Sequence, residues 1–274
     1  MTDVGGTGAG GPPAVAVARG TDSYRPGRPI EVVAPEGAAG APVVLFWHGS
    51  GPDERDALVP LATRVASYGV LALVPDWRSD DLDVGADELV DSIAFASASA
   101  ARLGGDPGRV VLAGWSLGAS AAADIALHPG IADGWRPAGL VGLGGGYDRS
   151  PFGGPRAPAP TADVVAGGAG RPALLVHGTT DTVIPPERSA VATAAFLEAG
   201  WHATLHQLGT DHAGVIGTVY DRALRRCVPS PDPDRLSALA QVGAQVAGVA
   251  LGTEPAVGAR RPGTESQPAR KRMM

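Results

Sequence analysis

The sequence predicts one α/β domain built on a doubly wound, mostly parallel sheet flanked by helices. Short apolar runs of strand length alternate with longer stretches of helical periodicity along most of the 274 residues. The runs are almost continuous in Val, Leu and Ala, which is typical of strands covered on both faces in a parallel sheet. We therefore expect a single domain over residues 14–251, with disordered tails over residues 1–13 and 252–274.

The expected strands come at regular intervals. The runs AVAVA (14–18) and PIEVVAP (29–35) predict an early hairpin. Buried strands are expected at residues 42–47, 70–74, 109–114, 140–145 and 172–177, and a final strand at residues 202–208.

The segments between these strands predict helices. Apolar residues recur at helical spacing in residues 54–69, 84–105, 116–128, 185–200 and 235–251. Residues 147–171 differ, because they are rich in Pro and Gly and show little helical pattern. We expect a long loop there, at the sheet edge where ligands bind in this class of fold, and no large cap domain.

Composition excludes several classes of protein. The net charge is −6 and the 22 basic residues are dispersed through the body of the chain, which argues against a nucleic-acid partner. No apolar run reaches the ~18 residues of a membrane span, and the N-terminus shows no secretory signal.

The single cysteine, Cys227, fits a reducing compartment, so we expect a cytoplasmic protein. No cluster has the spacing of metal ligands, and no metal or cofactor is expected. The oligomeric state stays open.

The pentapeptide GWSLG at residues 114–118 is the first sign of chemistry. An expected strand leads into it and an alanine-rich helix leads out, so Ser116 stands at a tight strand-to-helix corner. Glycines at Gly114 and Gly118 relieve the crowding that such a corner creates. This context favours an exposed nucleophile over a purely structural turn.

A serine hydroxyl needs a base to accept its proton, and the base needs a group that orients it. Asp181 lies in the turn just past the strand at residues 172–177, and His212 lies in the loop after the last expected strand. Both follow Ser116 in the order that this fold requires. His177 ends a strand, and we interpret it as a packed, hydrogen-bonded residue rather than as the base.

Acyl transfer also requires donors for an oxyanion. The loop FWHGSGPDE (46–54) combines a strand end with glycines, and we expect its donor to be the backbone N–H of Ser50. The second donor is expected on the residue after the nucleophile, Leu117. His48 is expected to brace this loop. Trp115 and Tyr147 are candidate substrate-binding residues.

Four motifs make the chain resemble the α/β-hydrolases, and among them the small carboxylesterases grouped with dienelactone hydrolases and acetyl-xylan or feruloyl esterases. They are HGSG at 48–51, GWSLG at 114–118, HGTTDTVIP at 177–185 and DHAG at 211–214. The resemblance implies that Ser116 is the nucleophile, His212 the general base and acid, and Asp181 its orienting carboxylate. Dienelactone hydrolases commonly carry a cysteine nucleophile, so the serine here favours ordinary ester hydrolysis.

The function expected is hydrolysis of a small-molecule carboxylic ester through an acyl-enzyme. The same site suits a thioester, a lactone or a short peptide, and these substrates stay open as alternatives. A catalytically silent binding domain is a further alternative, but such a domain would have lost a member of the Ser, His and Asp set, and all three are present.

Overall fold

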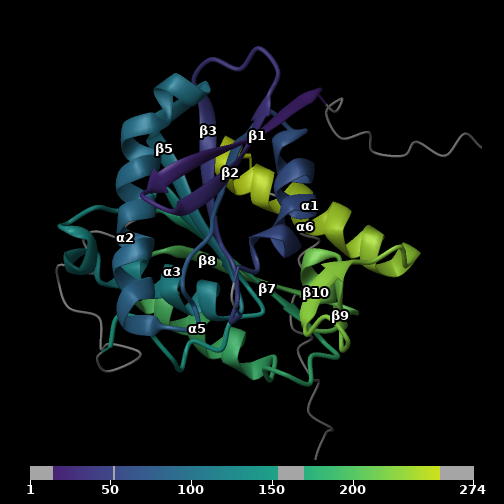
Figure 1. The fold of residues 1–274 in the computed structure, drawn as a ribbon. Helices are drawn as coiled ribbons and strands as arrows, with labels where there is room; N and C mark the ends of the chain where they lie inside the picture. Colours follow the sequence, from purple (N-terminus) through teal and green to yellow (C-terminus); the bar gives the residue numbers. More distant parts are fainter. Residues whose placement is uncertain (1–14, 52, 154–169, 254–274) are drawn as a thin grey trace, which may run out of the picture.

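Strands and helices alternate along the chain and build one eight-stranded sheet between two layers of helices (Figure 1). The computed structural model describes residues 15–51, 53–153 and 170–253. The strands of the main sheet are β1 (Val17–Arg25), β2 (Arg28–Pro35), β3 (Ala41–Trp47), β4 (Leu71–Pro75), β5 (Gly105–Trp115), β6 (Gly139–Leu143), β7 (Pro172–Gly178) and β8 (His202–Leu208). Their order across the sheet is β1-β2-β4-β3-β5-β6-β7-β8.

The sheet is parallel except at one end. Strands β4, β3, β5, β6, β7 and β8 run in the same direction, whereas β1 and β2 form an antiparallel hairpin that pairs with β4. The expected doubly wound, mostly parallel sheet is therefore confirmed.

Helices cover both faces of the sheet. Helices α1 (Arg55–Ala66) and α6 (Pro233–Leu251) lie on one face, and α2 (Leu82–Ser99), α3 (Leu117–Leu127) and α5 (Glu187–Glu198) lie on the other (Figure 1). Three short 3₁₀ turns connect elements, namely η1 (Ala101–Leu103), η2 (Pro129–Ala132) and η3 (Gly214–Ile216). Among the described helices, none is long and apolar enough to cross a membrane.

Strand β3 shows how the sequence fills both layers. Successive side chains of a strand point to opposite faces, so Val43, Leu45 and Trp47 pack towards α2 and α3. Val44 and Phe46 pack towards α1 and α6. All five are fully buried, and each buried side chain of this size contributes about 1.5–3 kcal/mol to folding. This explains why the central strands read as continuous apolar runs.

Three predictions of secondary structure are wrong in extent. The first strand is β1, over Val17–Arg25, and only Val17 and Ala18 belong to the predicted run 14–18. It is a mostly exposed edge strand, so no apolar pattern marks it. The helix predicted over 84–105 ends at Ser99. The strand predicted over 109–114 is β5, which already begins at Gly105. The left-handed Gly104 turns the chain between η1 and β5.

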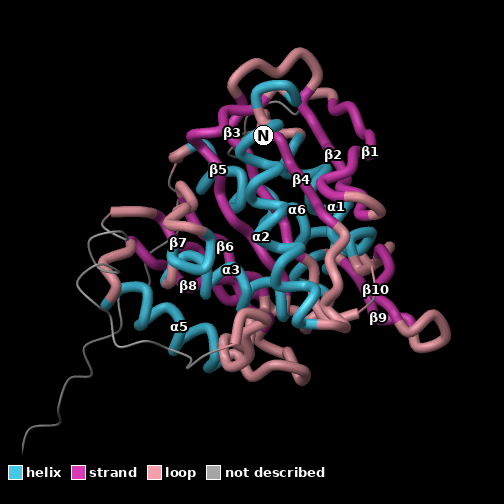
Figure 2. The backbone as a smooth tube through the Cα atoms, turned by 60° about the vertical axis from the view of Figure 1, so that its left-hand side comes forward, coloured by secondary structure: helices cyan, strands magenta, loops and turns pink. Residues whose placement is uncertain are grey.

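A second, two-stranded sheet was not predicted. Strands β9 (Thr218–Asp221) and β10 (Arg226–Pro229) form an antiparallel hairpin beside α1 and α6 (Figure 2). Its residues include the exposed Tyr220 and the buried Cys227, whose thiol pKa burial raises to about 11.

Some predictions fall outside the part of the chain that the structure describes. These are the tail predicted over residues 1–13, residues 254–274 of the tail predicted over 252–274, and residues 154–169 of the expected loop. Within the described ranges, no segment builds a cap over the sheet.

The parallel arrangement brings distant loops to one edge of the sheet. Trp115 at the end of β5 pairs with Leu143 of β6, and Leu143 pairs with Val176 of β7. The carboxyl ends of β3, β5, β6, β7 and β8 therefore lie side by side. Each is followed by one of the segments that the sequence singled out, so we expect a functional site at this edge of the sheet.

Candidate active site

Ser116 sits at a strained corner between β5 and α3. The strand runs to Trp115 and the helix begins at Leu117, so the serine alone makes the turn. Its backbone has φ 56° and ψ −117°, a conformation that residues other than glycine rarely adopt. A hydrogen bond of 2.9 Å from its N–H to the carbonyl of Leu143 fixes the turn to β6. The serine is only half-buried, so its hydroxyl remains accessible.

The two glycines of GWSLG are required by close approach. A Cβ atom on Gly114 would overlap the backbone carbonyl of Gly118, and one on Gly118 would overlap the carbonyl of Trp47 in β3. Helix α3 therefore starts almost in contact with the strands beneath it. This is the steric role that the sequence predicted for both residues.

Asp181, His212 and Ser116 form a continuous line of hydrogen bonds, which we call the Ser–His–Asp chain. The Nε2 atom of His212 lies 3.0 Å from Oγ of Ser116, and its Nδ1 atom lies 2.7 Å from Oδ2 of Asp181. The aspartate follows β7 and the histidine follows β8, each in a loop at the carboxyl edge of the sheet. The structure thus brings together the three residues that the sequence singled out.

Asp181 is held as an anion by the hydrogen-bond donors around it. Burial acts to raise its pKa, but hydrogen bonds from His177, His212 and the backbone N–H of Ile184 outweigh this effect and hold the pKa well below its usual range. Its Oδ1 atom accepts from the N–H groups of Val183 and Ile184 at 2.8 and 2.9 Å. The carboxylate is therefore fixed in place and stays ionised near neutral pH.

The side chain of Trp115 packs against His212. Its indole N–H donates to the backbone carbonyl of His212 at 3.1 Å, and the two rings lie 5.3 Å apart in a tilted arrangement. The side chain is buried. These contacts belong to a residue that positions the imidazole, and a contact between Trp115 and substrate remains a prediction.

The HGSG loop lies directly against the serine. A Cβ atom on Gly49 would come within 3.0 Å of Cβ of Ser116, so only glycine fits there without displacing the nucleophile. Ser50 follows it and is exposed. Ser79 holds Gly51, because its hydroxyl accepts from the N–H of Gly51 and donates to the carbonyl of the same residue, both at 2.8 Å.

His48 braces the start of this loop and is uncharged. Its ring is fully buried, and burial lowers its pKa to about 4. Its Nε2 atom accepts from the N–H of Trp77 at 3.3 Å, and the indole of Trp77 donates to the carbonyl of His48 at 3.2 Å. Trp77 and Ser79 thus anchor the HGSG loop from the segment that follows β4. No sequence motif pointed to either residue.

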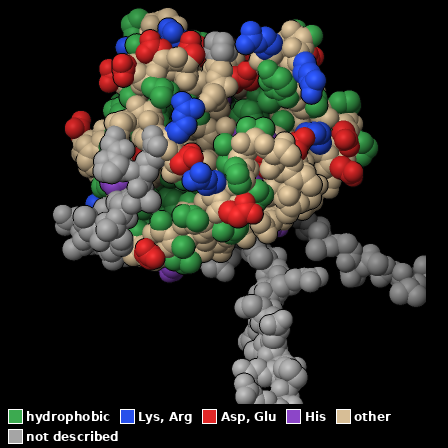
Figure 3. Space-filling model, turned by 90° about the horizontal axis from the view of Figure 1, so that it is seen from below, with side chains coloured by type: hydrophobic (Ala, Val, Ile, Leu, Met, Phe, Trp, Pro, Cys, Tyr) green, Lys and Arg blue, Asp and Glu red, His purple; other side chains and the backbone are tan. Residues whose placement is uncertain are grey.

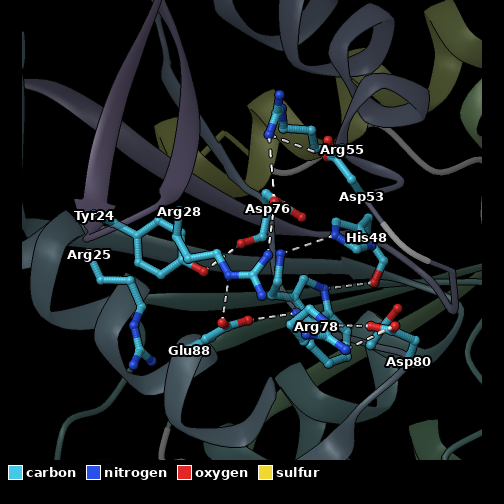
Figure 4. A network of polar contacts seen from close by, with 12 residues as sticks. Tyr24, Arg25, Arg28, His48, Asp53, Arg55, Asp76, Arg78, Asp80 and Glu88 are labelled. Atoms are coloured by element: carbon cyan, nitrogen blue, oxygen red, sulfur yellow. Dashed lines mark hydrogen bonds and ion pairs between the residues drawn. The ribbon is translucent and has the colours of Figure 1, made fainter. Parts of the chain in front are cut away.

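A group of ion pairs lies behind that segment (Figure 4). Arg28 of β2 contacts Glu88 of α2 at 2.6 Å and Asp76, which follows β4, at 3.2 Å. The other oxygen of Glu88 accepts from the backbone N–H of Arg78 at 2.7 Å. We call Arg28, Asp76 and Glu88 the Arg28 cluster. It fixes the segment that carries Trp77 and Ser79.

Leu117 presents the first backbone N–H of α3. The first N–H groups of a helix have no partner within it, and the helix dipole favours negative charge at this end. Leu117 itself is buried and follows Ser116 directly. Its N–H is therefore suited to donate a hydrogen bond to an oxygen that develops negative charge beside the serine.

Tyr147 contacts helix α3 at Ser120, about one helical turn along from Ser116. Its N–H donates to the hydroxyl of Ser120 at 3.0 Å, and its ring packs over Gly142 and Gly145 of the β6 segment. It lines a cavity of about 300 Å³ between α3 and α5, together with Phe196 and neighbouring residues. Contact of Tyr147 with substrate also remains a prediction.

The structure is similar to solved esterases. It superposes on esterase 2 of the Planctomycetes species Thermogutta terrifontis in its native form with a TM-score of 0.63 and 18% identity, covering 90% of this chain and 96% of that one. The propionate-bound form gives 0.63 and 17%, covering 88% and 97%. The form phosphoramylated by tabun gives 0.64 and 17%, covering 86% and 96%. No protein-family model matches the chain, and no curated protein matches it in sequence.

At this level of identity, the comparison establishes the fold. The chain has the α/β-hydrolase fold, as the motif resemblance implied.

Proposed function

We propose that this protein is a serine hydrolase that cleaves small carboxylic esters through an acyl-enzyme. One observation carries the proposal, namely the Ser–His–Asp chain that ends on a half-exposed hydroxyl at a strained corner. Strain of this kind persists only where the surrounding structure enforces it, and it is common at catalytic residues.

The geometry supports a defined sequence of proton transfers. Oγ of Ser116 attacks the carbonyl carbon of the ester while Nε2 of His212 accepts its proton. Asp181 keeps the Nδ1–H tautomer of the imidazole and stabilises the imidazolium that forms. The imidazolium then protonates the leaving alcohol, and water attacks the acyl-enzyme with His212 acting again as base to release the acid.

Two backbone donors would stabilise the tetrahedral oxyanion. We assign them to the N–H groups of Leu117 and Ser50, one at the start of α3 and one in the HGSG loop. The contact of Gly49 with Ser116 supports this assignment, because it brings the loop beside the nucleophile. Donors of this kind contribute about 10²–10³-fold each to kcat.

The comparisons favour an ester over the alternative substrates. The solved structures of the Thermogutta esterase include forms with propionate and with butyrate bound, and a form phosphorylated by paraoxon. By analogy of fold, we extend short acyl groups and reaction with organophosphates to this chain as expectations.

The test is covalent labelling combined with turnover. We expect wild type to react with a fluorophosphonate probe and with paraoxon at Ser116, and to hydrolyse short-chain p-nitrophenyl esters. Ser116→Ala should lose labelling and about 10⁵-fold or more in kcat while remaining folded. Ser97→Ala, a serine on α2, is the control and should behave as wild type. Equal labelling of wild type and Ser116→Ala would contradict the proposal.

The proposed partner is a small-molecule ester, with no nucleic acid or membrane involved. On the face seen in Figure 3, basic and acidic side chains are interspersed among hydrophobic ones. The cytoplasmic location and the independence from a cofactor remain predictions from the sequence.

A further inference from the structure

A second histidine contacts the carboxylate of Asp181. The Nε2 atom of His177 lies 3.2 Å from Oδ2 of Asp181, the same oxygen that His212 contacts at 2.7 Å. His177 is completely buried at the end of β7. One carboxylate oxygen therefore lies between two imidazoles, one of which reaches the serine and one of which does not.

The partners of His177 define its protonation state. Its Nε2 atom also lies 3.0 Å from the carbonyl oxygen of Ile184, so both neighbours of Nε2 are acceptors and this nitrogen carries a proton. Its Nδ1 atom lies 2.6 Å from Oγ of Ser189, a hydroxyl that can donate. A His177 tautomer with a proton only on Nε2 fits these contacts, with its one Nε2–H shared between the carbonyl of Ile184 and Oδ2 of Asp181.

We propose that His177 is a positioning residue that shares Oδ2 of Asp181 with His212 and thereby sets the pH at which His212 becomes a free base. This inference rests on the proposed function. A hydrogen bond donated to Oδ2 holds the carboxylate in place and withdraws part of its negative charge from His212. The imidazolium of His212 is then stabilised less than it would be by an unshared carboxylate, so the base is active at lower pH.

The groups around this pair come from several elements. The loop after β7 contributes the N–H groups of Val183 and Ile184 to Oδ1 of Asp181, and the indole ring of Trp115, at the end of β5, packs beside His212. Helix α5 contributes Ser189, which also contacts the hydroxyl of Tyr147 from the β6 segment.

One charged pair lies next to His212 in the chain. Asp211 is paired with Arg235 of α6 at 2.6 Å. Burial acts to raise the pKa of Asp211, but the guanidinium outweighs it and holds the pKa below its usual value. Asp211 therefore keeps its charge across the pH range in which an imidazole titrates. A shift in the pH profile of a His177 variant then does not come from titration of Asp211.

The test is the pH profile of His177→Leu. Removing the donor leaves Oδ2 to His212 alone, which stabilises the imidazolium and raises its pKa. We expect the acid limb of kcat/KM for p-nitrophenyl acetate to move to higher pH by about half a unit or more. We also expect kcat at the plateau to fall about tenfold through looser positioning of Asp181. NMR titration of the His212 ring proton should show the same upward shift without reference to turnover.

Three variants control the experiment. In His177→Gln the amide N–H can replace the Nε2 donor, so the acid limb should return towards wild type. Ser189→Ala removes the hydroxyl that fixes the tautomer and should shift the limb in the same direction by less. It also serves if His177→Leu does not fold. His202→Leu, at an exposed histidine on β8, should change nothing.

The outcomes separate this inference from the proposed function. If Ser116→Ala is inactive but folded His177→Leu, or Ser189→Ala in its place, keeps the wild-type acid limb and His212 titration, the inference about His177 is wrong and the proposed function stands. If Ser116→Ala hydrolyses esters as wild type does, the proposed function itself fails, and the His212 titration alone then decides whether His177 tunes that imidazole.

Discussion

The Ser–His–Asp chain and the Arg28 cluster both contain buried carboxylates, but these carboxylates have different partners. In the cluster, the guanidinium of Arg28 contacts Glu88 at 2.6 Å and Asp76 at 3.2 Å. In the chain, the carboxylate of Asp181 meets only imidazoles and backbone N–H groups in the contacts we describe. One region pairs full charges, and the other surrounds one charge with dipoles.

This difference matches what each region has to do. A carboxylate compensated by a permanent cation has little field left to stabilise another charge. Among the residues that the structure describes, no such cation lies within hydrogen-bonding distance of Asp181, so its charge acts on His212 when the imidazolium forms. In the Arg28 cluster each carboxylate contacts a guanidinium, Glu88 that of Arg28 and Asp76 those of Arg28 and Arg55. The effect of these ion pairs is to hold the segment after β4 in place. The comparison therefore predicts that the chain governs rate and the cluster governs stability.

The largest effect should come from removing the charge of the chain. We expect Asp181→Asn to lower kcat about 10³–10⁴-fold, because the amide favours the wrong tautomer of His212 and does not stabilise the imidazolium. Turnover of p-nitrophenyl acetate by purified enzyme measures this. A loss of less than tenfold in a folded variant would break the contrast between the two regions.

The same variant tests the lowered pKa of Asp181. A carboxylate whose pKa is depressed in the folded state stabilises the protein above its unfolded pKa of ~3.9 and loses that contribution as the pH falls through the folded value. The difference in unfolding free energy between wild type and Asp181→Asn should thus be constant above pH ~5 and shift against wild type on further acidification. Urea unfolding at several pH values measures it.

The next effect concerns stability. We expect Glu88→Gln to lower the free energy of unfolding by about 3 kcal/mol, because it leaves the mostly buried guanidinium of Arg28 without its nearest anion. kcat per folded molecule should change less than threefold. Replacing the pair together, in Arg28→Met/Glu88→Leu, should recover part of the loss, since no charge is then left uncompensated. Additive losses in the double variant would argue against the pairing.

The Ser–His–Asp chain was predictable from the sequence, whereas the Arg28 cluster was not. Ser116, Asp181 and His212 each follow a strand of the parallel part of the sheet, which brings the carboxyl ends of its strands to one edge. Their positions are therefore encoded locally, in turn residues beside strands. The contacts of Arg28 depend instead on β2 lying next to β4, an order across the sheet that no local pattern specifies.

The misplaced strand β1 and the unpredicted β9–β10 hairpin follow the same rule. Strand β1 pairs on one side only and the β9–β10 hairpin lies outside the main sheet, so neither needs the apolar pattern that marks a buried strand. The second contact of Asp181 was likewise hidden. The position of His177 at a strand end predicted a packed, hydrogen-bonded residue, as the structure confirms, but it did not identify the partner.

The smallest effect should come from the link between the two regions. Ser79 is carried by the segment that the Arg28 cluster fixes, and its hydroxyl makes both hydrogen bonds to Gly51 in the HGSG loop. Because it touches the loop and not the serine, Ser79→Ala should loosen the proposed oxyanion donor at Ser50 and lower kcat about five- to tenfold, with KM nearly unchanged. Ser97→Ala is again the matched control. If Ser79→Ala lowers the free energy of unfolding by more than ~2 kcal/mol but leaves kcat intact, the segment after β4 contributes to stability alone. Ser79 would then not link the region that governs rate to the region that governs stability.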